Sequence, residues 1–202
     1  MNKLDNIIYI VDDDEDFRNS ISWLLESANQ TVRCFSSARN FLENYDGNLG
    51  CMLLDVRMPD INGLALQQIM AERGINIPII VISGHGDIQM AVSAMKQGAM
   101  DFLEKPFDGD VLIRLVKKAL SSVKTDYDRL TEIKRVRDLF ENLSKREAEV
   151  MGLVVNGKSN RDIAASLKIS PKTVEIHRSR VMTKMKAKNV AELIQLSNCL
   201  EI

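Results

Sequence analysis

The chain has 202 residues, of which 45% are hydrophobic and 27% charged, with ten Gly and four Pro. This composition excludes disordered and fibrous proteins, and the length is sufficient for two domains. The net charge of −1 hides an asymmetry, because residues 1–143 carry 16 Lys and Arg against 22 Asp and Glu, whereas residues 144–202 carry 11 against 6. A basic C-terminal segment favours contact with a polyanion, although a surplus of this size also arises by chance.

The cysteines and the apolar runs bear on the cellular compartment. Cys34, Cys51 and Cys199 are odd in number and widely spaced, which favours buried, reduced thiols over a disulfide framework. No apolar run in the sequence approaches the roughly 18 residues needed to span a bilayer. We therefore expect a cytoplasmic protein with neither a signal peptide nor a membrane anchor.

Short β-branched runs alternate with amphipathic stretches over the first 107 residues. The third and fourth runs are continuously apolar, which is typical of central parallel strands covered by helices on both faces. The alternation predicts an α/β fold, a doubly wound five-stranded parallel sheet. The expected strands are 7–11, 31–35, 51–54, 79–82 and 101–103, and the expected helices are 17–28, 38–45, 64–72 and 88–97.

A long helical pattern without Gly or Pro follows from Asp110 to Asn142. Its apolar residues recur with a mean separation of about 3.5 residues. In one interpretation the last helix of the first domain continues into a linker helix, whose apolar stripe packs on the domain or on a partner chain. In the other, the linker is solvated and the helix breaks near residues 121–126.

The last 60 residues predict a small all-α domain of four helices. Ser144 and Glu147 have the spacing of a capping box at the start of the first helix. Ser159 begins the second helix, Pro171 stands at the first position of the third, and the fourth covers 190–199. The expected domains are therefore residues 1–120 and 143–202, joined by a helical linker over 121–142.

Polar side chains follow four of the expected strands. Asp12 and Asp13 come after the first, Asp55 after the third, Ser83 ends the fourth, and Lys105 follows the fifth. Because the carboxyl ends of parallel strands meet at one edge of a sheet, we expect these side chains to converge.

Three convergent carboxylates require a cation, and Mg²⁺ (or Mn²⁺) binds one or two carboxylates while keeping positions for water and phosphate. Beside such an ion, Asp55 can act as a nucleophile toward a phosphoryl group, while Lys105 and Ser83 stabilise charge on the phosphate oxygens. The pattern therefore predicts a metal-dependent phosphoryl-acceptor site.

Three segments resemble the receiver domain of two-component response regulators: VDDDEDFR at 11–18, LLDVRMPDINGL at 53–64 and ISGHGDIQMAVSAMKQGAMDFLEKPF at 82–107. The likeness covers about 120 residues. It implies a flavodoxin-like sheet in the order 2-1-3-4-5, with Asp55 as the acceptor of phosphate from a sensor histidine kinase. It also implies metal binding by Asp12, Asp13, Asp55 and the backbone carbonyl of Arg57.

The same resemblance implies a conformational switch. Ser83 and Lys105 match the phosphate-sensing pair, and the Lys105–Pro106 peptide is expected to be cis. Phe102 is expected to rotate inward when phosphate draws the hydroxyl of Ser83 toward it, although Phe102 as an ordinary core residue remains an alternative. His85 is expected near the mouth of the site and not as a metal ligand.

The second and third helices of the last domain, joined by a short turn, have the arrangement of a helix-turn-helix. The third helix carries a polar, basic face, while Val174, Val181 and Met185 fit an inward face. Basic side chains on it, such as Lys184, would hold DNA phosphates, and Glu175 could read base edges. A solvated amphipathic helix in a small bundle is the alternative.

Residues 143–194 resemble the LuxR-type helix-turn-helix, with SPKTVEIHRSRVMTKMKAK as the most specific part, and the whole chain resembles the FixJ/NarL type of response regulator. Glu175 departs from the lysine that some relatives carry, which leaves the base preference open. The resemblance places Lys172, Thr173, Glu175, Ile176, Ser179 and Arg180 nearest DNA, with His177 and Arg178 on the DNA-backbone side.

Together these patterns predict a transcription regulator that dimerises on phosphorylation and binds a two-fold promoter site in double-stranded DNA, with RNA polymerase as a further partner. The protein is expected not to be an enzyme beyond its own phosphotransfer and slow dephosphorylation.

A phosphohydrolase is one alternative, but such an enzyme needs a second acid at the position that Arg57 occupies. A docking module that ignores phosphate is the other, and the complete acid, hydroxyl and lysine set disfavours it.

Overall fold

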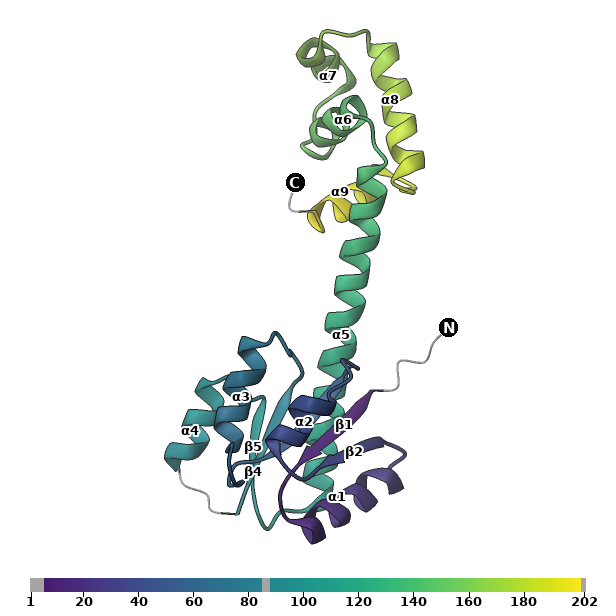
Figure 1. Cartoon of the computed structure of the whole chain (residues 1–202). Helices are drawn as coiled ribbons and strands as arrows, with labels where there is room; N and C mark the ends of the chain where they lie inside the picture. The colour runs from purple at the N-terminus through teal and green to yellow at the C-terminus, as the bar shows by residue number, and fades with distance from the viewer. Residues whose placement is uncertain (1–5, 85–87, 201–202) are drawn as a thin grey trace. The chain divides into compact units, whose positions relative to one another are not determined.

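The structure is a computed structural model that describes residues 6–84 and 88–200 (Figure 1). The chain divides into two compact units, one ending at Asp126 and the other beginning at Tyr127. The described elements, in chain order, are β1 (Ile7–Val11), α1 (Glu15–Ser27), β2 (Thr31–Phe35), α2 (Ala38–Asn44), β3 (Gly50–Asp55), α3 (Gly63–Glu72), β4 (Ile79–Ser83), α4 (Ile88–Lys96), β5 (Asp101–Glu104), α5 (Gly109–Glu141), α6 (Lys145–Val155), α7 (Asn160–Leu167), α8 (Pro171–Lys184) and α9 (Val190–Asn198).

The strands of the first unit form a five-stranded sheet across the described residues, in the order β2-β1-β3-β4-β5, and every neighbouring pair is parallel. The predicted fold and strand order are confirmed. In this order β1 and β3 are neighbours, so the residues that follow them emerge side by side. The carboxyl ends of β1 and β3 therefore lie together at one edge of the sheet.

The two faces of the sheet carry separate apolar cores, as the period-two alternation of a strand requires. Tyr9 and Leu54 face the core completed by α2, α3 and α4, whereas Ile10 and Leu53 face the core completed by α1 and α5. β1, β3 and β4 are buried along their whole length. This double coverage explains why their sequences are apolar without alternation.

The thiols are free, as expected, but the expectation of buried thiols is wrong for Cys34, which is exposed. Cys34 lies on β2, an edge strand of the sheet whose burial pattern is mostly exposed or intermediate. Only Cys51, on the central strand β3, is fully buried, and Cys199 is intermediate. Edge position is a property of the strand order, which a local apolar run does not reveal.

α5 is continuous from Gly109 to Glu141, so the interpretation of a linker broken near residues 121–126 is wrong. The N-terminal part of its apolar stripe is buried in the first unit at Leu112 and Val116, and Val136 is buried in the core of the second unit. Between them, Tyr127 and Leu130 are exposed. No helix of the described ranges has the length and apolar character needed to cross a membrane.

The second unit is all-helical, and its helices begin where the capping signals predict. Ser144 and Ser159 each form a complete capping box, and Ser170 accepts a hydrogen bond from the backbone N–H of Thr173 with Pro171 at the start of α8. The inward face of α8 is also confirmed, because Val174, Val181 and Met185 are fully buried in the core with residues of α6, α7 and α9.

A glycine holds the chain close to Asp55. Gly63 begins α3, and a Cβ on it would lie 2.3 Å from the backbone oxygen of Asp55. Its N–H donates to the carbonyl of Val56 over 3.0 Å. The loop after β3 therefore closes tightly beneath the acidic edge, and only glycine permits that approach.

We predict that Gly63→Ala destabilises the first unit by about 1 to 3 kcal/mol, because the backbone of Asp55 has to move away from the new methyl group. Calorimetry of the full chain measures it. The control is Gly152→Ala in α6, where a Cβ meets nothing within 4 Å and helix propensity predicts a gain of up to about 1 kcal/mol. Equal effects of the two substitutions would contradict the close approach.

Candidate functional site

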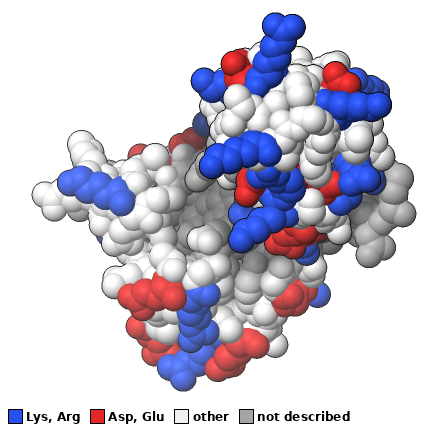
Figure 2. Space-filling model, turned by 90° about the horizontal axis from the view of Figure 1, so that it is seen from above, with Lys and Arg blue, Asp and Glu red and all other residues white. Residues whose placement is uncertain are grey.

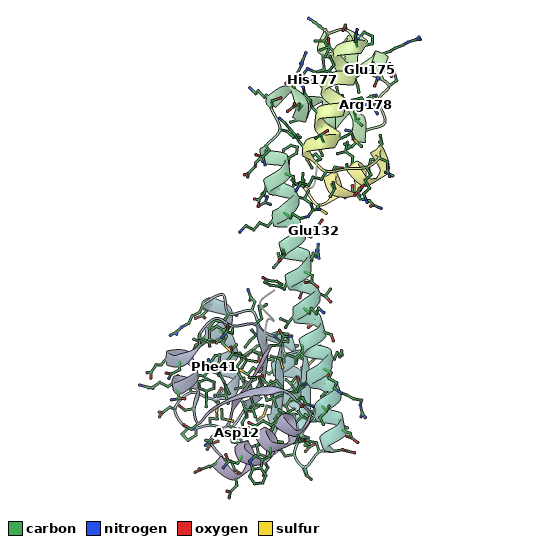
Figure 3. All side chains as sticks on the ribbon, turned by 90° about the vertical axis from the view of Figure 1, so that its right-hand side faces the viewer. Asp12, Phe41, Glu132, Glu175, His177 and Arg178 are labelled. Atoms are coloured by element: carbon green, nitrogen blue, oxygen red, sulfur yellow. The ribbon has the colours of Figure 1, made fainter. Side chains whose placement is uncertain are left out.

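Lys105 joins two buried carboxylates at the carboxyl edge of the sheet. Its Nζ donates to Asp12 Oδ2 over 2.8 Å and to Asp55 Oδ1 over 3.0 Å. Asp12 is 1% and Asp55 7% exposed. Residues at the carboxyl ends of β1, β3 and β5 thus meet at one point, as the strand positions predicted. Figure 3 labels Asp12 in the first unit. With both carboxylates ionised, one ammonium leaves a net negative charge there.

The remaining oxygens of the two carboxylates are held by backbone N–H groups. Asp12 Oδ1 accepts from the N–H of Asp14 over 2.9 Å, and Asp55 Oδ2 accepts from the N–H of Arg57 over 2.6 Å. Arg18 donates to the backbone carbonyl of Asp12 over 2.7 Å. Both carboxylates therefore have a fixed orientation before any ligand binds.

Burial and charge act in opposite directions in this cluster. Desolvation raises the pKa of Asp12, and the charge of Asp55 raises it further, against the lowering effect of the hydrogen bonds from Lys105 and the Asp14 N–H. Burial alone would lower the pKa of Lys105, but its hydrogen bonds to both carboxylates outweigh burial and raise it. The lysine therefore stays charged.

The other predicted receiver residues lie around this cluster. Ser83 is buried at the end of β4, where its backbone carbonyl accepts from the N–H of Lys105 over 2.8 Å and its hydroxyl approaches Met90 Sδ at 3.7 Å. Phe102 is half-buried on the α4 side of the sheet. The Lys105–Pro106 peptide is cis. His85 lies outside the described residues.

Asp13 is exposed, unlike its neighbour Asp12. Within residues 6–84 and 88–200, no three His, Cys, Asp or Glu side chains are grouped so that they could hold a metal ion. The structure therefore brings together Asp12 and Asp55, and it does not gather the three predicted carboxylates into one cluster.

Phe17 belongs to this site although the sequence did not single it out. Lys105 Nζ lies 3.6 Å from the centroid of its ring. Phe17 and Lys105 line a cavity of about 410 Å³ together with Ser20, Ile21, Gly84, Pro106 and Phe107. An aromatic residue in the first turn of the helix after the acidic pair, and a second one after Lys105–Pro106, were the signals available in the sequence.

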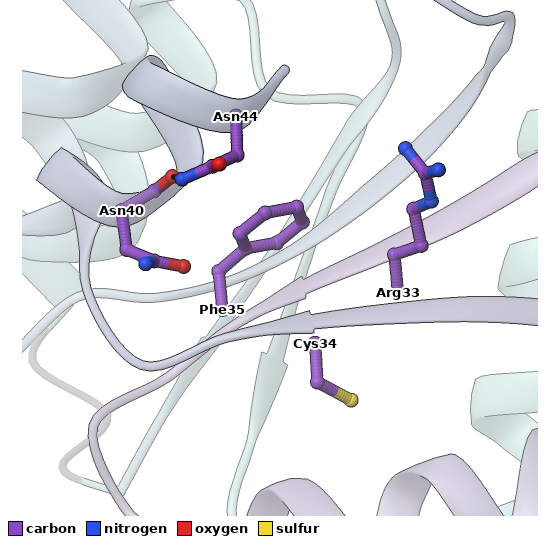
Figure 4. Close-up of a pocket in the computed structure, with 5 residues that line it drawn as sticks. All are labelled: Arg33, Cys34, Phe35, Asn40 and Asn44. Atoms are coloured by element: carbon purple, nitrogen blue, oxygen red, sulfur yellow. Dashed lines mark hydrogen bonds between the residues drawn. The ribbon is translucent and has the colours of Figure 1, made fainter. Parts of the chain in front are cut away.

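A second cavity, of about 440 Å³, lies between β2 and α2 (Figure 4). Its lining consists of Arg33, Cys34, Phe35, Asn40 and Asn44. None of the predicted site residues is among these five, and none of the five is a carboxylate. The predicted site residues that the structure brings together lie instead at the carboxyl edge of the sheet, beside Lys105.

The exposed face of α8 contains most of the predicted DNA contacts. Six of them are exposed, and five of these recur at intervals of three and four residues along one side of the helix: Lys172, Glu175, Ile176, Ser179 and Arg180. The sixth is Lys184, at the end of the helix. Thr173, His177 and Arg178 are half-buried. Figure 3 labels Glu175, His177 and Arg178 on this helix, and Figure 2 shows Lys and Arg side chains spread over one face of the chain with Asp and Glu among them.

Two of the predicted contacts also hold the second unit together. Arg178 Nη1 donates to Asn160 Oδ1 at the start of α7 over 2.7 Å. Lys184 Nζ donates to Glu147 Oε2 over 2.7 Å and to the carbonyl of Asn142 over 3.1 Å. Both side chains tie α8 to neighbouring elements, which fixes its orientation within the unit.

Glu147 accepts the hydrogen bond by which Lys184 connects α8 to α6. It is buried, it completes the capping box of α6, and its hydrogen bond from Lys184, with those from Ser144, lowers its pKa from 4.5 to about 2. A carboxyl whose pKa is lower in the folded state stabilises the fold above pH 4.5, and that contribution is lost as the pH falls toward 2.

We predict that Glu147→Gln destabilises the second unit at pH 7 and that the difference from the wild type shrinks steadily as the pH falls below 4.5. Urea unfolding at a series of pH values measures it. Glu149→Gln is the control, because the exposed Glu149 pairs with Arg146 on the surface and exposed pairs contribute little. A difference between Glu147→Gln and wild type that is independent of pH would contradict this role.

Comparisons with known proteins find a match for each of the two units. Residues 8–117 match the response regulator receiver domain, and residues 141–197 match the luxR family of bacterial regulatory proteins. The chain is 43% identical to the response regulator protein TmoT of Ectopseudomonas mendocina, covering 100% of this chain and 92% of TmoT. It is also 43% identical to the transcriptional regulatory protein FixJ of Rhizobium meliloti, covering 96% and 95% of the two chains.

Solved structures show the same similarity over nearly the whole length. The response regulator StyR matches with a TM-score of 0.85 and 35% identity, covering 96% of this chain and 98% of that one. Full-length FixJ from B. japonicum matches with a TM-score of 0.62 and 38% identity, covering 97% of each chain.

The chain therefore belongs to the two-component response regulators that join a receiver domain to a LuxR-type helix-turn-helix. Within that family it resembles the FixJ-type proteins, which are transcription regulators and not enzymes. Receiver domains of this family typically use Mg²⁺. A kinase and DNA are the classes of partner that the two domains imply.

Proposed function

We propose that a sensor histidine kinase phosphorylates Asp55 and that this modification controls dimerisation and sequence-specific promoter binding. The domains are residues 1–120 for the receiver, 121–142 for the linker and 143–202 for DNA binding, in a cytoplasmic protein that acts with RNA polymerase. The observation that carries the proposal is the single ammonium of Lys105 shared by the buried carboxylates of Asp12 and Asp55.

The geometry supports Asp55 as the nucleophile. Its Oδ2 is fixed by the N–H of Arg57, which orients the carboxylate. A bond forms from a carboxylate oxygen of Asp55 to phosphorus, the bond from phosphorus to the kinase histidine nitrogen breaks, and the electron pair of that bond goes to the nitrogen. Lys105, already beside Asp55 Oδ1, then neutralises charge on the phosphate oxygens, and the Ser83 hydroxyl assists it.

The residues present fit a divalent ion. Asp12 and Asp55 share one ammonium, and Mg²⁺ or Mn²⁺ binds to one or two carboxylates without needing a full protein cage. Asp12, Asp55 and the backbone carbonyl of Arg57 would hold it, and Asp13, which is exposed and outside the Asp12–Asp55 cluster in this structure, would have to turn toward it to be a further ligand. When bound, the ion supplies positive charge that offsets the charge of the phosphoryl oxygens.

The conformational change on phosphorylation is proposed to begin at Ser83 and to extend to α4 and β5. The hydroxyl of Ser83 approaches Met90 of α4, so its displacement toward phosphate changes that contact and makes room for Phe102. The neighbouring face of α4 exposes Ile88, Val92 and Met95, which supports it as a dimer interface. The exposed Tyr127 and Leu130 of α5 support the linker helix as the alternative interface.

We predict that Asp55→Asn reduces phosphate uptake from acetyl phosphate to background, because the amide lacks the nucleophilic oxygen. Phosphate-affinity electrophoresis of the full chain in Mg²⁺ measures it. Asp60→Asn is the matched control, since Asp60 is exposed in the loop after β3 and its left-handed backbone suits asparagine. Uptake by Asp55→Asn at the wild-type level would refute the assignment of the acceptor.

Recognition of DNA is assigned to α8. Lys172 and Arg180 lie on its exposed face and are proposed to hold phosphates, with Glu175, Ile176 and Ser179 toward base edges and Thr173 and His177 beside the DNA backbone. Arg178 and Lys184 are proposed to reach the DNA backbone from the positions in which they tie α8 to Asn160 and Glu147.

We predict that Lys172→Ala and Arg180→Ala each weaken DNA binding and lower the slope of log affinity against log salt by about 1, because each removes one phosphate contact. Fluorescence anisotropy across a salt series measures it. Lys134→Ala, an exposed change on α5, should leave the slope unchanged. A loss of affinity with no change of slope would contradict a phosphate contact.

A further inference from the structure

The ammonium of Lys105 is covered on one side by an aromatic ring. Its Nζ lies 3.6 Å from the centroid of Phe17 while donating to Asp12 and Asp55. A cation within about 6 Å of a ring centroid is attracted to the face of the ring. The ammonium is therefore held by two carboxylates and one π face.

We propose that Phe17 is a positioning residue for Lys105, holding the ammonium at the acceptor carboxylate through its π face. The inference rests on the proposed function of Asp55 and Lys105 and adds to it the residue that sets where the lysine lies. A lysine side chain has four rotatable bonds and a strongly hydrated head, so carboxylates alone leave it several arrangements. The ring restricts these arrangements by occupying one side of the ammonium.

The ring of Phe17 is itself held in place. Phe107 packs edge-on against it, with centroids 6.1 Å apart and an interplanar angle of 89°. The backbone N–H of Phe17 donates to Asp14 Oδ1 over 3.0 Å, in the N-cap of α1. Because Phe107 follows Lys105 by two residues, the segment after β5 supplies both the cation and the support for the ring that covers it.

Ordinary packing accounts for only part of this position. Phe17 packs at the border of the core that α1 and α5 complete, but it is half-buried and lines an open cavity of about 410 Å³, so core atoms do not enclose its ring. A residue needed only for its apolar volume can be replaced by leucine, whereas a residue needed for its π face can be replaced only by another aromatic. This difference separates the two roles by experiment.

The test compares Phe17→Leu with Phe17→Tyr in the full chain. The first readout is the NMR shift of the Lys105 ε-methylene protons without Mg²⁺, which a ring face 3.6 Å from Nζ moves upfield. We expect that upfield shift in the wild type and in Phe17→Tyr, and its loss in Phe17→Leu.

The second readout is the initial rate of phosphate uptake from acetyl phosphate in Mg²⁺. We expect the rate to decrease by about 3- to 10-fold for Phe17→Leu and to stay near the wild-type rate for Phe17→Tyr.

Two results would overturn the proposal: Lys105 methylene shifts that do not depend on the ring, or equal uptake rates for Phe17→Leu and the wild type. The upfield shift of the Lys105 methylene protons is measured in the wild type without any variant. Its absence would therefore overturn the proposal even if Phe17→Leu is poorly folded. Failure of the proposed function is recognised separately, because Asp55→Asn would then take up phosphate while the ring shift at Lys105 is unchanged.

Discussion

The receiver unit depends on one cation held between two carboxylates that are almost fully buried. Lys105 links Asp12 to Asp55, and without it two like charges would face each other in a desolvated site. The β2-β1-β3-β4-β5 order brings the three residues together, and the close approach of Gly63 beneath Asp55 keeps the loop in place. The net negative charge that makes the site costly favours the binding of a further cation.

In the second unit, a buried carboxylate orients a helix. Glu147 accepts from Lys184 and completes the cap of α6, so the ion pair orients α8 relative to α6. The face of α8 that carries Lys172, Glu175 and Arg180 stays exposed. The side chains proposed to read DNA therefore lie on a helix that is fixed within its unit, which suits recognition of base edges.

Strands were predictable to within one residue at each end, and helices to within two, because apolar periodicity and caps such as Ser144 and Ser159 are local signals. The convergence of Asp12, Asp55 and Lys105 was also predictable, since parallel strands place their ends at one edge. Features set by tertiary position were not predictable from the sequence. Cys34 is exposed because β2 is an edge strand. Phe17 lies over Lys105 and packs against Phe107, which is far from it in the sequence. The pairing of Lys184 with Glu147, 37 residues apart, gave no sequence signal.

The identity of the acceptor is tested most directly by locating the phosphoryl group itself. Borohydride reduces an acyl phosphate to an alcohol, so treating the phosphorylated full chain and sequencing its peptides by mass spectrometry marks the modified carboxylate. The account predicts the alcohol at Asp55 alone. A mark at Asp12 or Asp13, or unmodified Asp55 in protein that has taken up phosphate, would contradict it.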